Sequence, residues 1–285
     1  MKKLVIFGVG LIGGSVALAV KRHLSDFHIV GVDRLNVLNE ALKLNVIDEK
    51  CTSPQKAVQD ADFILLATPV SKISNILEDI KHSLESYTII TDVGSTKLDV
   101  IKAINLTLDE GQKNQFVPGH PIAGAEKSGV SAAKADMFKH KAVVLTPFEN
   151  NASVQKVRAF WSSIGAIPTI MSAAEHDQIF ASVSHLPHLL AFALVDELSS
   201  RQNADDLFEF AASGFRDFTR IAGSNPEMWR DISLANRNAL ITEISAYKNK
   251  LNEVNKMLEQ SDSKGLLKLF ERASVARNAW ANGRK

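Results

Sequence analysis

Three glycines near the N-terminus form the first pattern with a chemical meaning. Gly8, Gly10 and Gly13 follow a short apolar run and precede a helix-like segment. In that setting the first glycine permits a tight turn, the second lets the backbone approach a pyrophosphate, and the third allows close packing of helix on strand. The free N–H groups of the first helical turn, around Leu11 and Ile12, would hold the phosphates. The pattern predicts a dinucleotide-binding site.

Asp33 stands 20 positions after Gly13, at the end of the next predicted strand. A carboxylate there accepts hydrogen bonds from both hydroxyls of an adenine ribose and repels a 2′-phosphate, which favours NAD over NADP. Arg34 acts in the opposite direction, because its guanidinium can pair with that phosphate. The alternative role of Asp33 is to cap a turn at the strand end.

Two later turns also follow predicted strands. Thr68 and Pro69 come after the run 63–67, and Gly94 comes after the run 88–92. In open parallel sheets, ligands bind outside the carboxyl ends of the strands, so we expect both turns to line the nicotinamide side of the cleft. The alternative is that each turn only connects a strand to a helix, with a Ser or Thr cap.

A parallel sheet must bring these strand ends together. Up to about residue 171, short β-branched runs alternate with helix-like segments, and several runs are apolar throughout, as in strands buried on both faces. After about Ser172 the strand signals stop. We predict an α/β protein with a doubly wound Rossmann-type NAD-binding domain over residues 1–171 and an all-helical substrate-binding and dimerisation domain over residues 172–285. The predicted strands cover residues 4–7, 29–32, 63–67, 88–92, 142–145 and 167–171.

One stretch of the C-terminal part carries a continuous apolar stripe at helical spacing. Packing within one chain and a two-fold interface between two chains can both cover such a stripe, and the second would make a homodimer. The stripe comprises Leu240, Ile244, Tyr247, Leu251, Val254 and Leu258.

Composition excludes several classes of function. The 33 Lys and Arg nearly balance the 32 Asp and Glu, so no broad field exists to attract nucleic acid or an anionic membrane. The only cysteine is Cys51, which excludes an intrachain disulfide and a cysteine-based metal site. The N-terminal apolar stretch is interrupted by glycines and runs into Lys21 and Arg22, unlike a signal peptide, and no other apolar run approaches the ~20 residues that span a bilayer. We expect a cytoplasmic protein.

Five motifs, including the glycine pattern described above, occur in order along the chain: residues 8–15 (GVGLIGGS), 92–97 (DVGSTK), 119–124 (GHPIAG), 184–188 (SHLPH) and 214–222 (GFRDFTRIA). Together they resemble the signatures of the prephenate and arogenate (cyclohexadienyl) dehydrogenases, over nearly the whole chain. The resemblance implies NAD-dependent oxidative decarboxylation of prephenate to 4-hydroxyphenylpyruvate, or of arogenate to tyrosine, in tyrosine biosynthesis. The sequence leaves the preference between the two substrates open.

The resemblance assigns roles to several side chains. His120 matches the residue that accepts the substrate hydroxyl proton, which suits an imidazole, although a lone His beside Pro is usually a structural turn residue. Ser95 matches the serine that hydrogen-bonds that hydroxyl, and it is also a candidate helix N-cap. Arg220 matches the arginine that fixes a substrate carboxylate, with Asp217 on the same helical face to orient it; the alternative is a surface ion pair.

Other polar residues have weaker assignments. Glu126 resembles a residue at the cleft entrance that influences substrate or tyrosine binding, or it is a solvated loop charge. His188 matches a contact to the substrate side chain, whereas His185 is predicted to be structural. Their spacing of three does not complete a zinc pattern, so we expect no metal. Pro187 should break or kink its helix.

Two rival functions share parts of this pattern. Another two-domain NAD(P)-dependent dehydrogenase, acting on a small hydroxy acid or an imine, would carry the glycines but does not predict the motif at 119–124. A non-catalytic dinucleotide-binding regulator would leave His120, Ser95 and Arg220 without a purpose.

Overall fold

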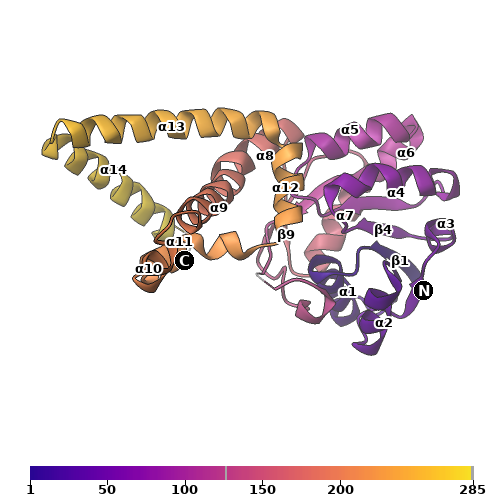
Figure 1. The fold of residues 1–285 in the computed structure, drawn as a ribbon. Coiled ribbons are helices and arrows are strands. Elements are labelled where there is room, and N and C mark those ends of the chain that lie inside the picture. The colour runs from indigo at the N-terminus through magenta and orange to yellow at the C-terminus, as the bar shows by residue number, and fades with distance from the viewer. Residues whose placement is uncertain (126, 284–285) are drawn as a thin grey trace. The chain divides into compact units, whose positions relative to one another are not determined.

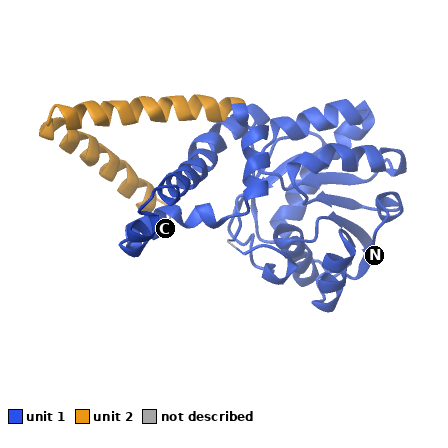
Figure 2. Ribbon diagram, viewed as in Figure 1, with its two compact units in different colours: residues 1–237 blue, residues 238–285 orange. Residues whose placement is uncertain are grey.

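The computed structural model describes residues 1–125 and 127–283. The chain divides into two compact units, Met1–Arg237 and Asn238–Lys285 (Figure 2). The first unit contains both β-sheets and the shorter helices. The second unit consists of the long helix α13 (Arg237–Glu259), apart from its first residue, and of α14 (Ser263–Asn282).

Six parallel strands form the main sheet in the order β3-β2-β1-β4-β5-β6. Figure 1 shows two of the central strands, β1 and β4, with helices on both sides of them. β1 pairs with β2 on one side and β4 on the other, so the strand order reverses beside β1 and creates the crevice where doubly wound sheets bind ligands. The predicted Rossmann-type fold is therefore confirmed. The strands are β1 (Lys2–Phe7), β2 (Phe27–Val32), β3 (Glu49–Cys51), β4 (Phe63–Leu66), β5 (Ile89–Asp92) and β6 (Phe116–Val117).

The sheet has an apolar core on each face because its central strands are apolar throughout. Leu4 and Ile6 of β1 join one core, while Val5 and Phe7 join the other, as the period of two in a strand requires. The helices α1 (Leu11–His23), α2 (Leu35–Lys43) and α7 (Ala152–Ser163) contribute to the first core. The second core takes side chains from α3 (Pro54–Val58), α4 (Ile73–Ile80) and α5 (Leu98–Thr107).

A separate sheet of three strands lies outside this arrangement, in the order β7-β8-β9. β7 (Gly119–Pro121) runs antiparallel to β8 (Ala142–Leu145), which is parallel to β9 (Ile167–Ile170). The predicted strands at 142–145 and 167–171 exist, but they do not belong to the main sheet. β3, β6 and β7 were not predicted, because two or three residues are too few to show a period.

A long helical run follows: α8 (Ala173–Phe180), a π-helical turn at Ala181–His185, and α9 (Leu186–Ser199). Pro187 does not break the helix, because it is the second residue of α9 and the helix continues through it. The other half of the expectation, a kink at Pro187, stays a prediction. The wider π turn just before it shifts the hydrogen-bond register, which is a common way to accommodate a missing backbone donor. The shorter helices are α6 (Glu110–Gln115), α10 (Ala204–Glu209), α11 (Ser213–Thr219) and α12 (Pro226–Ala235).

By length and composition alone, the run Ala173–Ser199 could cross a membrane. The statement that no second apolar run approaches that length was therefore wrong. The run nevertheless carries His176, Asp177 and His185, which are buried and polar. Only 22% of its most apolar window is buried within this chain, so an apolar surface is left for a partner.

The apolar stripe predicted between Leu240 and Leu258 lies on α13, and the single chain leaves most of it exposed. Tyr247 is 37%, Leu251 50% and Leu258 60% exposed, whereas Leu240 is buried. Exposed apolar residues that recur along one helix are typical of an interface between subunits.

Candidate active site

The glycine turn after β1 has the geometry that the motif requires. Gly8 has a φ of 90°, and a Cβ there would lie 2.5 Å from the Ala67 carbonyl oxygen. A Cβ at Gly13 would lie 2.0 Å from the Gly8 carbonyl oxygen, so packing of the chain itself excludes a side chain at both positions. A Cβ at Gly10 would meet no atom within 4 Å. The space in front of Gly10 is thus open to a phosphate approaching the backbone.

Asp33 and Arg34 lie beside this turn, at the end of β2. The Asp33 carboxylate accepts hydrogen bonds from the backbone N–H of Val9, at 2.9 Å, and of Arg34, at 2.7 Å. Asp33 therefore caps the turn, as the alternative interpretation proposed, and it stands at the edge where an adenine ribose would bind. The Arg34 side chain is 83% exposed, and its Nε lies 4.0 Å from an Asp33 carboxylate oxygen.

The ends of β4 and β5 complete this edge. The Thr68 hydroxyl is buried and has no hydrogen-bond partner among the described residues, and Pro69 begins the turn that follows. A Cβ at Gly94 would lie 2.5 Å from a Val70 methyl group. Gly94 therefore lacks room for a side chain, because Val70 and Asp92 fill the space beside it. The buried Thr68 hydroxyl without a partner, beside the switch point of the sheet, fits a bound dinucleotide such as NAD.

A buried ion pair attaches the second sheet to the end of β5. Lys97 bonds the Asp92 carboxylate, and both side chains are fully buried. Asp92 also accepts the backbone N–H of Gly119, at 3.0 Å, while Lys97 Nζ donates to the Gly119 carbonyl, at 2.8 Å. Both backbone groups of the residue before His120 are therefore fixed, and His120 is held beside the carboxyl end of β5.

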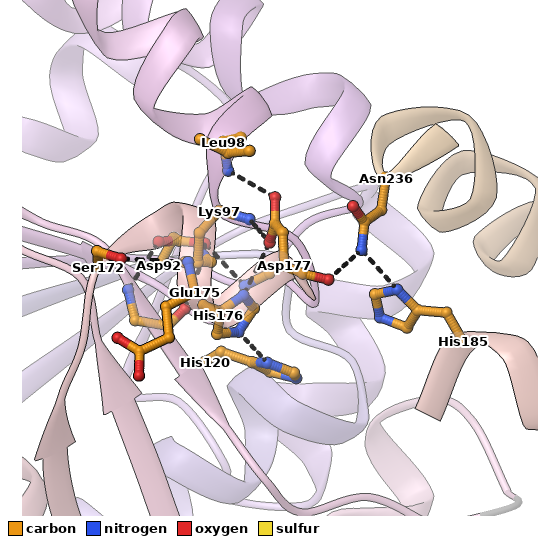
Figure 3. A network of polar contacts seen from close by, with 12 residues as sticks. Asp92, Lys97, Leu98, His120, Ser172, Glu175, His176, Asp177, His185 and Asn236 are labelled. Atoms are coloured by element: carbon orange, nitrogen blue, oxygen red, sulfur yellow. Dashed lines mark hydrogen bonds and ion pairs between the residues drawn. The ribbon is translucent and has the colours of Figure 1, made fainter. Parts of the chain in front are cut away.

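His120 ends a chain of buried side chains, which Figure 3 shows. Its Nδ1 lies 2.8 Å from His176 Nε2, and His176 Nδ1 lies 2.8 Å from an oxygen of Asp177. The Phe180 ring contacts both imidazoles, with centroid distances of 4.9 and 4.5 Å. His120 itself is partly exposed, whereas His176 and Asp177 are buried.

Asp177 connects the Asp177–His176–His120 series to α5, to Asn236 and, through Asn236, to His185. Its carboxylate accepts the backbone N–H groups of Lys97, at 2.8 Å, and Leu98, at 2.9 Å, and so caps α5. The Asp177 backbone carbonyl accepts a hydrogen bond from Asn236 Nδ2, at 2.7 Å. The same Asn236 nitrogen also lies 3.1 Å from His185 Nδ1. The alternative role of Ser95, as the N-cap, was therefore wrong, because an acid far along the chain caps this helix.

The three histidines of this cluster are poorly protonated. Burial, followed by the nearby His176 and Lys97, holds the pKa of His120 well below its ordinary value of 6.5. Burial also lowers the pKa of His176, although Asp177 opposes this. Burial lowers the pKa of His185 to about 4, against the effects of Asp177 and of the Ser95 carbonyl, which lies close by. The imidazoles are neutral and can accept protons.

A second group of predicted residues lies on α9 and the turn after α11. His188 Nδ1 lies 2.7 Å from the Ser184 carbonyl, and its ring stacks on Trp229, with centroids 3.7 Å apart. Arg220 is near enough to lower the pKa of His188, after burial as the larger cause. Asp217 is exposed on α11, which ends at Thr219, so the two residues do not share one continuous α-helix as predicted. Glu126 lies outside the described residues.

The charges of the predicted residues act on one another. His185 contributes to the lowered pKa of His120, His188 to that of His185, and Arg220 to that of His188. Ser95 joins the same cluster through the contact of its carbonyl with His185. Over the described residues, no three His, Cys, Asp or Glu side chains are placed to hold a metal ion.

Several residues of the network were not predicted as site residues: Lys97, His176, Asp177, Trp229 and Asn236. Their sequence signals were faint. Adjacent His and Asp residues on a helix are a weak sign of an oriented imidazole, and a Lys five positions after a strand-end Asp is a weak sign of an ion pair.

Comparison with known proteins decides the family. Residues 16–169 match the nucleotide-binding domain of prephenate dehydrogenase, and residues 172–272 match its dimerization domain. The chain belongs to the prephenate dehydrogenase family. The resemblance inferred from the five motifs is thereby confirmed.

Individual members of the prephenate dehydrogenase family resemble the whole chain. A prephenate dehydrogenase from Bacillus subtilis is 38% identical over 96% of this chain and 75% of its own length. A cyclohexadienyl dehydrogenase from Zymomonas mobilis is 34% identical over 98% of this chain and 96% of its own. A crystal structure of prephenate dehydrogenase from A. aeolicus, in complex with hydroxyphenyl propionate and NAD+, superposes with a TM-score of 0.90 at 34% identity, covering 97% of both chains.

Proposed function

We propose that this protein is an NAD-dependent dehydrogenase that oxidatively decarboxylates prephenate, and arogenate as the alternative substrate, in tyrosine biosynthesis. The observation that carries the proposal is the place of His120, a neutral and partly exposed imidazole beside the carboxyl ends of β4 and β5. Whole-chain similarity to an enzyme crystallised with NAD+ and a hydroxyphenyl compound supports it. A cytoplasmic location is part of this proposal.

The substrate ring would bind with its hydroxyl at His120 Nε2, with Ser95 beside it. NAD, when bound, accepts a hydride from the ring carbon that carries the hydroxyl. His120 takes up the hydroxyl proton as the carbon–oxygen bond gains double-bond character. Loss of the ring carboxylate as carbon dioxide leaves its electron pair in the ring, and the imidazolium returns the proton to the phenol oxygen. No net proton is released, so the His120 imidazole returns to its neutral form at the end of each turnover.

Arg220 is proposed to hold a substrate carboxylate, because a guanidinium binds that group in a planar, bidentate manner. His188 is proposed to contact the substrate side chain through Nε2, since its Nδ1 is bonded to the Ser184 carbonyl. Asp217 is proposed to orient or gate Arg220. Glu126, which lies outside the described residues, is proposed to influence the binding of substrate or tyrosine. At the cofactor end we assign the backbone around Gly8, Gly10, Leu11, Ile12, Gly13 and Gly94, together with Asp33, Arg34, Thr68 and Pro69.

We propose residues 1–171 as the cofactor domain and residues 172–285 as the substrate and dimerisation domain of a homodimer. The exposed stripe on α13 and the apolar surface of α9 support a second copy of this chain as the partner. Replacing Leu251 and Leu258 by Lys should yield a monomer, measured by light scattering, whereas an unchanged mass would place the interface elsewhere.

The test of the function is a direct assay. Purified protein is mixed with NAD and prephenate, and NADH is followed by absorbance while the aromatic product is identified by chromatography. We expect NADH and 4-hydroxyphenylpyruvate in equal amounts. Parallel reactions with arogenate and with NADP determine the preferences. Absence of NADH with both substrates would reject the proposal in favour of another dehydrogenase or a regulator.

A further inference from the structure

The network behind His120 determines which of its ring nitrogens carries a proton. The starting point is Asp177, whose carboxylate already accepts two backbone N–H groups, from Lys97 and Leu98. The third contact of that carboxylate is His176 Nδ1, at 2.8 Å. Because the fixed partners of Asp177 are donors, its carboxylate acts as an acceptor throughout, and His176 Nδ1 must be an N–H.

The same logic passes to the next ring. Burial disfavours the doubly protonated form of His176, so its Nε2 carries no proton and is an acceptor. His120 Nδ1 lies 2.8 Å from that atom and must therefore be the donor. A neutral His120 with a proton on Nδ1 has a bare lone pair on Nε2, which is the ring nitrogen left for a substrate.

The reverse arrangement is disfavoured at Asp177. A proton on His176 Nε2 would turn the lone pair of its Nδ1 toward the Asp177 carboxylate. His120 Nδ1 would then be the acceptor, and the proton of His120 would lie on its Nε2. Rotation of the rings is also restricted, because Phe180 contacts both imidazoles. The charged and titratable groups around His120 are Asp92 and Lys97, near the end of β5, with His176, Asp177 and His185 from the helical run.

We propose that His176 and Asp177 are positioning residues that fix His120 as the Nδ1–H tautomer, so that its Nε2 accepts the substrate hydroxyl proton. The inference rests on the proposed function of His120 as proton acceptor. It gives the Asp177–His176–His120 series the logic of a base oriented by a third group. When His120 is protonated in turnover, the Asp177 carboxylate stabilises the positive charge through His176.

The first test needs no turnover. Two-dimensional ¹⁵N–¹H spectra of the histidine rings in the cofactor-free protein report the tautomer of each imidazole. The His120→Asn variant assigns the signals of His120 by their loss. We expect protonated Nδ1 and bare Nε2 for both His120 and His176. A His120 protonated on Nε2 would overturn the inference.

The second test separates positioning from structure. His176→Phe keeps a ring of similar size but removes the acceptor, so we expect kcat to fall about 10-fold to 100-fold while the KM for prephenate changes by less than about 2-fold. His176→Gln supplies an amide oxygen that can accept from His120 Nδ1, and it should restore most of kcat. His82→Gln, at an exposed histidine after α4, is the matched control and should behave as wild type.

The outcomes distinguish the two hypotheses. If the wild type does not turn over prephenate or arogenate, the proposed function fails, and the ring spectra still decide the tautomer. If the wild type is active but His176→Phe is equally fast, the inference alone fails. If His176→Phe does not fold, the Gln variant and the wild-type spectra decide. The positioning role is rejected if the folded His176→Gln variant has lost its activity and the wild-type spectra show His120 protonated on Nε2.

Discussion

The cofactor end and the substrate end of the proposed active site are built from different materials. At the cofactor end, backbone atoms of one turn form the surface, and Gly10 offers open space where a side chain would stand. At the substrate end, His120, His176 and Asn236 come from three distant elements and depend on one another. A backbone-built surface should fail when volume is added, whereas a side-chain network should fail when one partner is removed.

The largest loss of activity should come from removing the proton acceptor at the substrate end. His120→Asn keeps a polar side chain but removes the basic nitrogen, so kcat should fall by about 10³-fold. Prephenate binding, measured by calorimetry with the variant, should stay within about 3-fold of wild type, because the carboxylate contacts remain. His82→Asn serves as the control. A His120→Asn enzyme with substantial turnover would refute the assignment of the base.

The next largest effect should come from removing the proposed contact between Arg220 and a substrate carboxylate, at the same end. Arg220→Ala removes a charge-assisted hydrogen bond of about 1.5–3 kcal/mol, which corresponds to an increase of about 10-fold to 100-fold in the KM for prephenate. The decrease in kcat should be smaller. Arg220→Lys should recover only part of the affinity, since an ammonium group cannot form the bidentate pair. An unchanged KM in steady-state assays would remove Arg220 from the substrate site.

At the cofactor end, two glycine-to-alanine substitutions three positions apart should separate an effect on stability from an effect on NAD binding. Gly13→Ala forces a Cβ against the Gly8 carbonyl and should lower the free energy of unfolding by about 1–3 kcal/mol in urea titrations. Gly10→Ala meets no protein atom, so stability should be unchanged while the Kd for NAD rises about 10-fold. If Gly10→Ala binds NAD normally, the pyrophosphate does not lie against Gly10.

The same contrast explains what the sequence could reveal. The glycine turn, Asp33 and the central strands were predictable because each depends on neighbours within one turn or one strand. The network was not, since the Asp177 that caps α5 is 80 residues from Lys97 and Asn236 is 59 residues from Asp177. Local reasoning therefore offered Ser95, a hydroxyl just before the helix, as an alternative cap. It also placed β8 and β9 in the main sheet, because a short strand carries no information about which sheet it joins.

The smallest expected effect is a shift in pH dependence that only the side-chain end should show. Burial and the neighbouring His176, Lys97 and His185 hold the pKa of His120 well below 6.5. The neutral imidazole is the proton acceptor, and activity is lost only when the pH falls through this lowered pKa. The acid limb of kcat/KM, which reports the free enzyme, should therefore lie below pH 6.5. Backbone N–H groups do not titrate, so NAD affinity should change less than kcat/KM between about pH 5 and 7. A kcat/KM midpoint at or above 6.5 would mean that the proton acceptor is more exposed than His120 is here. A loss of NAD affinity parallel to the loss of kcat/KM would mean that a titrating side chain, and not the backbone, dominates cofactor binding.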